Sequence, residues 1–225
     1  YACFFYGGNP VPQTPAFRVR IYHPLLITSC DLNKDGYRDI VNLEGGFPKE
    51  VYRFNIFYGG PDLDSVPDMQ ITLPDSTVAV YFQGRDWPID FDGDHREELV
   101  YTTHSAQRIY FIRNFAVNQP LEYYFIPQVG NMLYSTTGLF SSDLDGDGKS
   151  DITTLASDFS GLKLLRFYYG NSNFDFSEYY EFSSDTVFHP EEYYLLNDMN
   201  GDGKGEIMLY LPPSTVGGGY GISFG

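Results

Sequence analysis

The stretch DLDGDGKSD, residues 143–151, places four carboxylates and two glycines within nine residues. Two carboxylates about 4 Å apart repel each other by roughly 4 kcal/mol at an effective dielectric constant near 20. Four converging carboxylates therefore open the turn unless a cation lies among them. The stretch predicts a metal-binding loop.

Three related stretches occur elsewhere in the chain, and their first residues are separated by 59, 53 and 55 positions. A short apolar or β-branched run follows each one, namely IVNL, LVYTT, ITTL and IMLYL. Such runs predict strands that leave the loops. We call the four stretches loop 1 (DLNKDGYRD, 31–39), loop 2 (DFDGDHREE, 90–98), loop 3 (DLDGDGKSD, 143–151) and loop 4 (DMNGDGKGE, 198–206).

A second landmark recurs about 20 residues after each loop, and further apolar runs precede the loops and follow the landmark. Each repeat therefore predicts four strands. Nowhere do apolar residues recur at the spacing of three and four positions that is typical of an amphipathic helix. Four-stranded units at a period of about 55 residues are typical of an all-β fold, the β-propeller. The landmark copies are FFYGG (4–8), IFYGG (56–60), IYFIRN (109–114), RFYYG (166–170) and GISFG (221–225).

The expected domain organisation is a single β-propeller domain or segment over residues 1–225, with about four repeats. The strand runs begin and end with the third strand of a repeat, and four repeats are fewer than most propellers need. We expect a part of a larger propeller; the alternative is a four-bladed ring with an extra edge strand. The repeats span approximately 9–60, 61–113, 114–170 and 171–225, and residues 1–8 complete a preceding blade.

The loops share one pattern of oxygen donors when each is numbered from its first Asp. Positions 1, 3, 5 and 9 carry side-chain oxygens, and position 7 can add a backbone carbonyl. Five hard oxygen donors with water suit Ca²⁺ better than Mg²⁺, and the lack of Cys and His at these positions disfavours zinc. We expect about four calcium ions. The predicted ligands are Asp31, Asn33, Asp35, Tyr37 and Asp39; Asp90, Asp92, Asp94, Arg96 and Glu98; Asp143, Asp145, Asp147, Lys149 and Asp151; and Asp198, Asn200, Asp202, Lys204 and Glu206.

The second loop departs from the pattern. His95 stands at position 6, where the other loops have a glycine that permits positive φ, and Glu98 stands at position 9. We therefore expect loop 2 to be the weakest site despite its four acids.

The negative charge belongs mainly to these loops. The formal net charge is -16, and 14 of the 30 acidic residues are at ligand positions, which leaves 16 acids against 14 basic residues. This balance argues against binding to nucleic acid or to anionic lipid. No apolar run reaches about 18 residues, so membrane insertion is not expected. Cys3 and Cys30 form either one disulfide or two thiols.

The DxDxDGxxD loop, the apolar strand after it and the FYGG, FYYG and ISFG strand ends resemble the FG-GAP or VCBS repeats of integrin α-subunit propellers and many secreted bacterial proteins. The resemblance implies a propeller with Ca²⁺ in loops that join the first two strands of a blade. It also implies a binding or scaffolding module in most members, whereas some similar propellers are polysaccharide lyases or phospholipases.

A catalytic reading has little support in the residues. None of the histidines His23, His95, His104 and His189 belongs to a recognisable motif, and no nucleophile or nucleotide motif is present. The clusters EYYF and EEYYLL are expected to be core, with sugar stacking as the alternative, and Trp87 is the first candidate for an exposed aromatic contact.

We therefore expect a non-catalytic, calcium-stabilised module of an exported protein, located extracellularly, at the cell surface or in the periplasm. Ca²⁺ outside the cell is plentiful enough to fill weak sites. The module is expected to recognise a protein or a glycan, or to be a subunit of a larger cell-envelope assembly. The alternative is a polysaccharide lyase.

Overall fold

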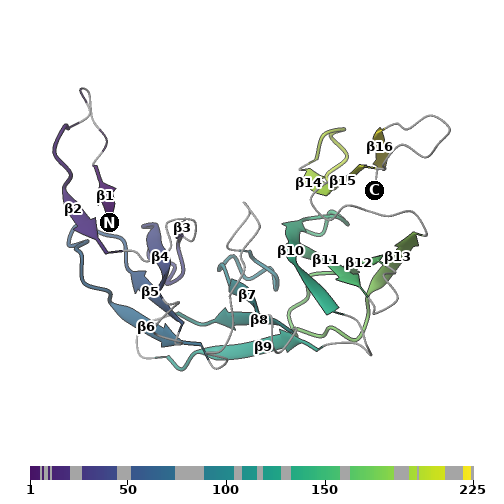
Figure 1. Ribbon diagram of the computed structural model, residues 1–225, viewed down its shortest axis with the longest axis horizontal. Coiled ribbons are helices and arrows are strands. Elements are labelled where there is room, and N and C mark those ends of the chain that lie inside the picture. The colour runs from purple at the N-terminus through teal and green to yellow at the C-terminus, as the bar shows by residue number, and fades with distance from the viewer. Residues whose placement is uncertain are drawn as a thin grey trace. The chain divides into compact units, whose positions relative to one another are not determined.

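A computed structural model of the chain describes most of the sequence, including all four loops (Figure 1). The contacts divide it into two compact units, of which unit 1 comprises Tyr1–Val80 with Asn114–Pro120, and unit 2 comprises Tyr81–Arg113 with Leu121–Gly225. The described residues are 1–5, 7, 10, 12–20, 27–44, 52–73, 89–103, 108–115, 119–127, 133–157, 163–184, 193–196, 198–210 and 220–223.

Across these ranges the chain is all-β: it forms antiparallel sheets and contains no helix. The expected fold class is therefore confirmed at this level. None of the sheets closes on itself within the same ranges. No helix long and apolar enough to span a membrane occurs in the described part of the chain.

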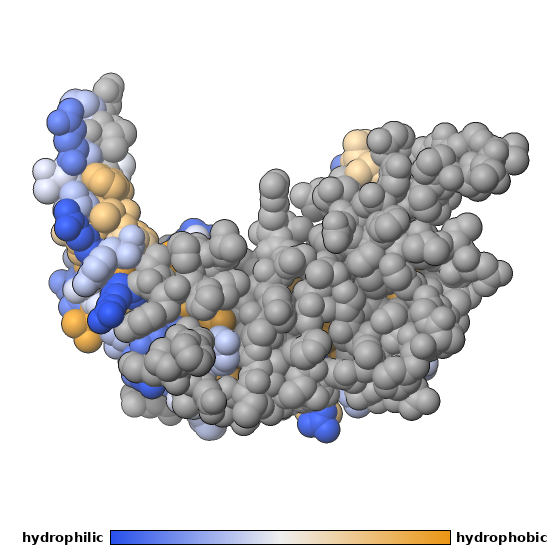
Figure 2. Space-filling model, in the orientation of Figure 1, coloured by the Kyte–Doolittle hydropathy of each residue, from blue (hydrophilic) through white to orange (hydrophobic). Residues whose placement is uncertain are grey.

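Unit 1 contains a two-stranded sheet and a four-stranded meander. The buried side chains of Val19, Ile40 and Phe57 form a core that joins the two sheets. Phe4 stacks on Phe17 with ring centroids 4.7 Å apart, and Figure 2 shows hydrophobic residues beside hydrophilic ones along this strand pair. The strands are β1 (Ala2–Phe4) and β2 (Phe17–Val19), then β3 (Ile27–Cys30), β4 (Asp39–Glu44), β5 (Arg53–Phe57) and β6 (Met69–Thr72).

Unit 2 contains three further meanders, in each of which consecutive strands are neighbours (Figure 1). The first sheet is β7 (Leu99–Thr103), β8 (Arg108–Arg113) and β9 (Glu122–Ile126). The second is β10 (Leu133–Ser142), β11 (Asp151–Ser157), β12 (Lys163–Tyr168) and β13 (Tyr180–Ser184). The third is β14 (Tyr193–Leu196), β15 (Glu206–Tyr210) and β16 (Tyr220–Ser223).

The middle sheet of unit 2 packs on both of its neighbours. Leu164 of β12 lies in one core with Phe111 of the first sheet, and the next residue, Leu165, lies in a second core against Ile207 of the third sheet. Successive side chains of a strand point to opposite faces, which explains this division. The three sheets are therefore stacked face to face.

The strands predicted after the loops are present. Residues 40–43, 99–103 and 152–155 lie in β4, β7 and β11, and residues 207–210 lie in β15. Each of loops 1, 3 and 4 joins the first two strands of a meander, β3 to β4, β10 to β11 and β14 to β15. The backbone hydrogen bonds of Ile89 with Glu98 close loop 2 in the same way.

Several sequence-based candidates have simple outcomes. Cys3 is exposed and Cys30 is buried, and no disulfide joins these two residues. Trp87, His23, His104 and His189 lie outside the described residues.

Candidate metal centres in the four loops

The carboxylate at position 1 holds each loop in a closed turn. One of its oxygens accepts the backbone N–H of position 6, at 3.0 Å in loops 1 and 2 and at 2.8 Å in loops 3 and 4. Its other oxygen accepts an N–H from position 4 or 5. The four stretches therefore share one backbone path as well as one sequence pattern.

Position 6 of every loop lies in the left-handed region. The φ angle is 88° at Gly36, 86° at Gly148 and 89° at Gly203, whereas His95 adopts 63° in loop 2. A side chain in this region costs about 1 kcal/mol or more relative to glycine. Loop 2 therefore carries backbone strain at His95 that the glycines of the other loops avoid.

The acid at position 9 is fully buried in all four loops, as Asp39, Glu98, Asp151 and Glu206. One oxygen of each accepts the N–H of position 2 at 2.7–2.8 Å. The acid therefore joins the start of the loop to its last residue, which is the first residue of the next strand in loops 1, 3 and 4 and directly precedes it in loop 2.

In loops 1 and 3 the second oxygen of this buried acid accepts a glycine N–H from the next strand's end. Gly59 donates to Asp39 and Gly170 donates to Asp151, each at 2.8 Å. A Cβ on Gly170 would lie 2.6 Å from the carbonyl oxygen of Phe91, and a Cβ on Gly59 would overlap the carbonyl of Arg38. Only glycine fits so close to a neighbouring backbone.

The sequence interpretation does not identify the part that these glycines have in closing the loops. The FYGG and FYYG landmarks were interpreted only as strand ends, although their glycines recur 20 and 19 residues after position 9. This regular spacing is the signal in the sequence that could have identified them. Two short antiparallel strands of about this combined length bring the chain back to the loop from which the first strand starts.

In loops 2 and 4 the buried acid retains an unsatisfied oxygen. Oε1 of Glu98 and Oε1 of Glu206 have no hydrogen-bond partner among the described residues and are shielded from solvent. A buried carboxylate oxygen without a donor is rare in folded proteins. A bound cation would satisfy such an oxygen, whereas protonation of the acid would remove its charge instead.

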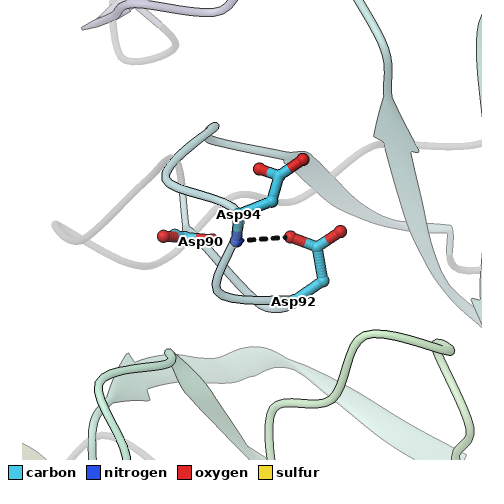
Figure 3. Close-up of side chains that lie close together, drawn as sticks. All are labelled: Asp90, Asp92 and Asp94. Atoms are coloured by element: carbon cyan, nitrogen blue, oxygen red, sulfur yellow. Dashed lines mark hydrogen bonds between the residues drawn. The ribbon is translucent and has the colours of Figure 1, made fainter.

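Three groups of carboxylates among the described residues have ligand atoms within 4.8 Å of one another. Figure 3 shows the loop 2 group, in which the N–H of Asp94 donates to the carboxylate of Asp92 at 3.1 Å. All of these donors are oxygen atoms, which suits hard cations. The groups are Asp90, Asp92 and Asp94; Asp143, Asp145 and Asp151; and Asp198, Asp202 and Glu206.

The remaining predicted ligands have other partners. The Asp147 carboxylate pairs with the Lys149 ammonium, and in loop 1 the Asn33 amide donates to Asp35 at 2.9 Å. At position 7 the backbone N–H donates to the position 5 carboxylate, at 2.8–3.0 Å for Tyr37, Arg96, Lys149 and Lys204. The carbonyl group of position 7 remains a predicted ligand.

Burial shifts the acidity of the position 9 side chains. Burial, with a smaller contribution from nearby loop carboxylates, raises the pKa of Glu98 to about 9 and that of Asp151 to about 6. The pKa of Asp39 is also raised by burial. Without a cation Glu98 is therefore protonated at neutral pH, and Asp151 is mostly protonated only below about pH 6. Binding of a cation to such a group releases its proton.

The loops of unit 2 are joined by backbone hydrogen bonds. The N–H at position 8 of loop 3, Ser150, donates to the carbonyl of Asp90 at position 1 of loop 2, with a length of 2.8 Å. The Asp90 N–H in turn lies 3.3 Å from the Ser150 hydroxyl. Neighbouring loops therefore contact each other directly.

Comparison of the chain with known protein families and with curated protein sequences finds no match.

Proposed function

We propose that the protein is a calcium-stabilised, non-catalytic β-propeller module whose loops 1, 3 and 4 bind Ca²⁺. The observation that carries this proposal is the shared loop geometry: a position 1 carboxylate that closes the turn and a fully buried acid at position 9. Four acidic turns built alike are difficult to explain as solvated surface loops.

The donor chemistry favours Ca²⁺ over other cations. Loops 3 and 4 each offer three carboxylates with ligand atoms within 4.8 Å, and the predicted position 7 carbonyl would add a further oxygen. Ca²⁺ accepts six to eight oxygen ligands in flexible geometry, whereas Mg²⁺ requires a tight octahedron and keeps several waters. The loop 4 site also supplies the unsatisfied Oε1 of Glu206.

The proposed role of the ion is structural. Position 9 begins the second strand of a meander and position 1 follows its first strand, so an ion between them links the two strands. It also neutralises carboxylates that are buried close together. Calcium at 100 times its dissociation constant adds about 2.7 kcal/mol per site to the free energy of unfolding.

The stacking of sheets supports the propeller part of the proposal. The middle sheet of unit 2 buries Leu164 on one face and Leu165 on the other, as an inner blade must between two neighbours. Two of the sheets in the described part of the chain are four-stranded meanders, β3–β6 and β10–β13, which is the blade topology of a propeller.

The proposed binding role is supported by exposed aromatic side chains on the outer strands. Tyr123 and Phe125 of β9 are about half exposed, while Tyr124 between them packs on the core. The expectation that the EYYF cluster is core therefore holds for Tyr124 only, because Tyr123 and Phe125 point to the opposite face of the strand. Such residues suit contact with a protein or a glycan. We place the module in an exported protein, outside the cell, at its surface or in the periplasm.

Calcium removal is the direct test. EDTA should lower the melting temperature and added Ca²⁺, but not Mg²⁺ at the same concentration, should restore it. Equilibrium dialysis should find bound calcium, and Asp145→Asn should remove one ion. An unchanged melting curve together with no bound calcium would overturn the proposal. Binding to proteins and glycans of the cell envelope would then identify the partner, with Tyr123→Ala as the variant expected to weaken contact.

A further inference from the structure

Loop 2 already contains a cation from its own chain. The guanidinium group of Arg113 at the end of β8 lies 2.5 Å from Oδ2 of Asp92 (through Nη1) and 3.1 Å from Oδ2 of Asp94 (through Nη2). These two acids belong to the carboxylate group shown in Figure 3. One side chain thus bridges positions 3 and 5 of the loop.

The bridge uses the oxygens that a metal ion needs. Oδ1 of Asp92 and Oδ1 of Asp94 each accept a backbone N–H within the loop, at 3.1 and 2.8 Å. Arg113 then engages the second oxygen of both side chains. Its planar fork of donors matches paired carboxylate oxygens better than an ammonium group does.

The guanidinium group is held in place by its surroundings. Its carbon atom lies 5.3 Å from the ring centre of Phe174, and its Nε lies 3.7 Å from Glu122. In loop 3, by contrast, Lys149 is paired with Asp147 and comes from the loop itself. A flexible lysine on the loop can move aside for an ion, whereas Arg113 is anchored on a strand.

The equivalent positions in other repeats carry no cation. The first residue after each of loops 1, 2 and 3 pairs with a residue of the following strand: Ile40 with Phe57, Leu99 with Ile112 and Ile152 with Tyr168. The residues that directly follow these three partners are therefore equivalent in the three repeats. Arg113 therefore stands where repeats 1 and 3 have Tyr58 and Tyr169. The arginine is particular to the repeat whose loop also departs from the pattern at His95.

We infer that Arg113 is the resident cation of loop 2, so that this loop is closed without metal and calcium binds only to the other loops. Loop 2 then remains ordered at low calcium. The carbonyl oxygen of Asp90 in this loop accepts the Ser150 N–H of loop 3. An ordered loop 2 therefore gives loop 3 one fixed hydrogen-bond partner before loop 3 binds its ion. This inference rests on the proposed calcium function of loops 1, 3 and 4.

A matched pair of nearly isosteric variants tests the inference. Asp92→Asn and Asp145→Asn change the same position of loops 2 and 3. Asp145→Asn should lower the number of bound calcium ions by one, as counted by equilibrium dialysis or native mass spectrometry. Asp92→Asn should leave the number unchanged and should lower the melting temperature in EDTA, since Arg113 loses a partner. Loss of one ion from Asp92→Asn would overturn the inference.

A gain-of-site variant gives an independent readout. Arg113→Tyr installs the residue of repeats 1 and 3 and should raise the number of bound ions by one, and adding Asp92→Asn should cancel the gain. Arg108→Tyr is the control on the same strand, and its ion count should equal that of the wild type. If Arg113→Tyr folds and gains no ion, the inference fails; if it does not fold, the Asp92→Asn and Asp145→Asn pair decides.

The inference can fail separately from the proposed function. A wild-type protein without any bound calcium would refute the function of loops 1, 3 and 4. Melting temperatures measured in EDTA would then test the role of Arg113, because Arg113→Tyr should lower the melting temperature by more than Arg108→Tyr does. Equal melting temperatures for the two variants would overturn it.

Discussion

The backbone N–H of Gly205 donates to the carbonyl oxygen of Asp143 at 2.6 Å, which joins position 8 of loop 4 to position 1 of loop 3. Ser150 and Asp90 form the same link between loops 3 and 2. A residue next to a proposed ligand in one loop therefore contacts the first ligand of the preceding loop. An ion that orders one loop should also order its neighbour.

We predict that calcium binding to loops 3 and 4 is coupled. Asp198→Asn should empty loop 4 and also weaken calcium binding to loop 3 by about two- to fivefold, the equivalent of one hydrogen bond of about 0.5–1 kcal/mol. The amide NMR signals of Gly146 and Gly148 follow loop 3 during a chelator-buffered titration. Asp175→Asn changes an exposed acid outside the loops and should leave the loop 3 affinity unchanged. Identical loop 3 affinities in Asp198→Asn and wild type would contradict the coupling.

Calcium affinity at loop 3 should fall in acid. Burial raises the pKa of Asp151 to about 6 in the metal-free protein, so below that pH an ion must displace a proton. The affinity should be nearly constant above about pH 7 and should fall toward tenfold per pH unit well below pH 6. Calorimetry at pH 5 in two buffers of different ionisation enthalpy should detect proton release, and at pH 8 it should detect almost none. Equal release at both pH values would exclude Asp151 as the titrating ligand.

The stability of the metal-free protein should fall as pH rises because of Glu98. The folded pKa of this group is raised to about 9 from a usual value near 4.5, mainly by burial, so its favourable contribution is complete below about pH 4.5 and is lost as pH rises through 9. Its slope approaches 1.4 kcal/mol per pH unit between these values.

The variant Glu98→Gln isolates this contribution. Glutamine stays neutral and its carbonyl can still accept the N–H of Phe91, which donates to Glu98 at 2.7 Å. In urea unfolding with EDTA, the variant should therefore gain stability over wild type by a few kcal/mol at pH 8 and show little difference at pH 5. A constant difference between the two proteins from pH 5 to pH 8 would count against the assignment.

Gly170→Ala should destabilise the protein by about 2–4 kcal/mol. The new Cβ would lie 2.6 Å from the carbonyl oxygen of Phe91, and relief of this overlap would pull the Gly170 N–H away from Asp151. Gly7→Ala is the control, because nothing lies within 4 Å of a Cβ at that position. Thermal unfolding in EDTA should show a loss of at least about 4 °C for the first variant only, given roughly 2–4 °C per kcal/mol at this chain length.

The sequence predicted the loops and the strands that follow them because both depend on short-range patterns. The acids of loop 3 and the run 152–155 after it act through spacing within a few residues. The contact of Arg113 with Asp92 could not be predicted in this way, because it depends on the register that pairs Leu99 with Ile112. Likewise, alternation alone shows that Tyr123 and Tyr124 point to opposite faces, and only the packing of Tyr124 on the core shared with the β10–β13 sheet shows which face is covered.

The two faces of β12 have a consequence for how such a chain can change over generations. Leu164 and Leu165 belong to different cores, so inserting or deleting one residue in this strand exchanges the two faces and disrupts both neighbouring sheets at once. An insertion or deletion in a connection between strands does not exchange the faces of a strand and leaves both cores in place. Length variation among descendants of this chain should therefore collect in the connections, and whole repeats should be gained or lost more readily than single residues of an inner strand.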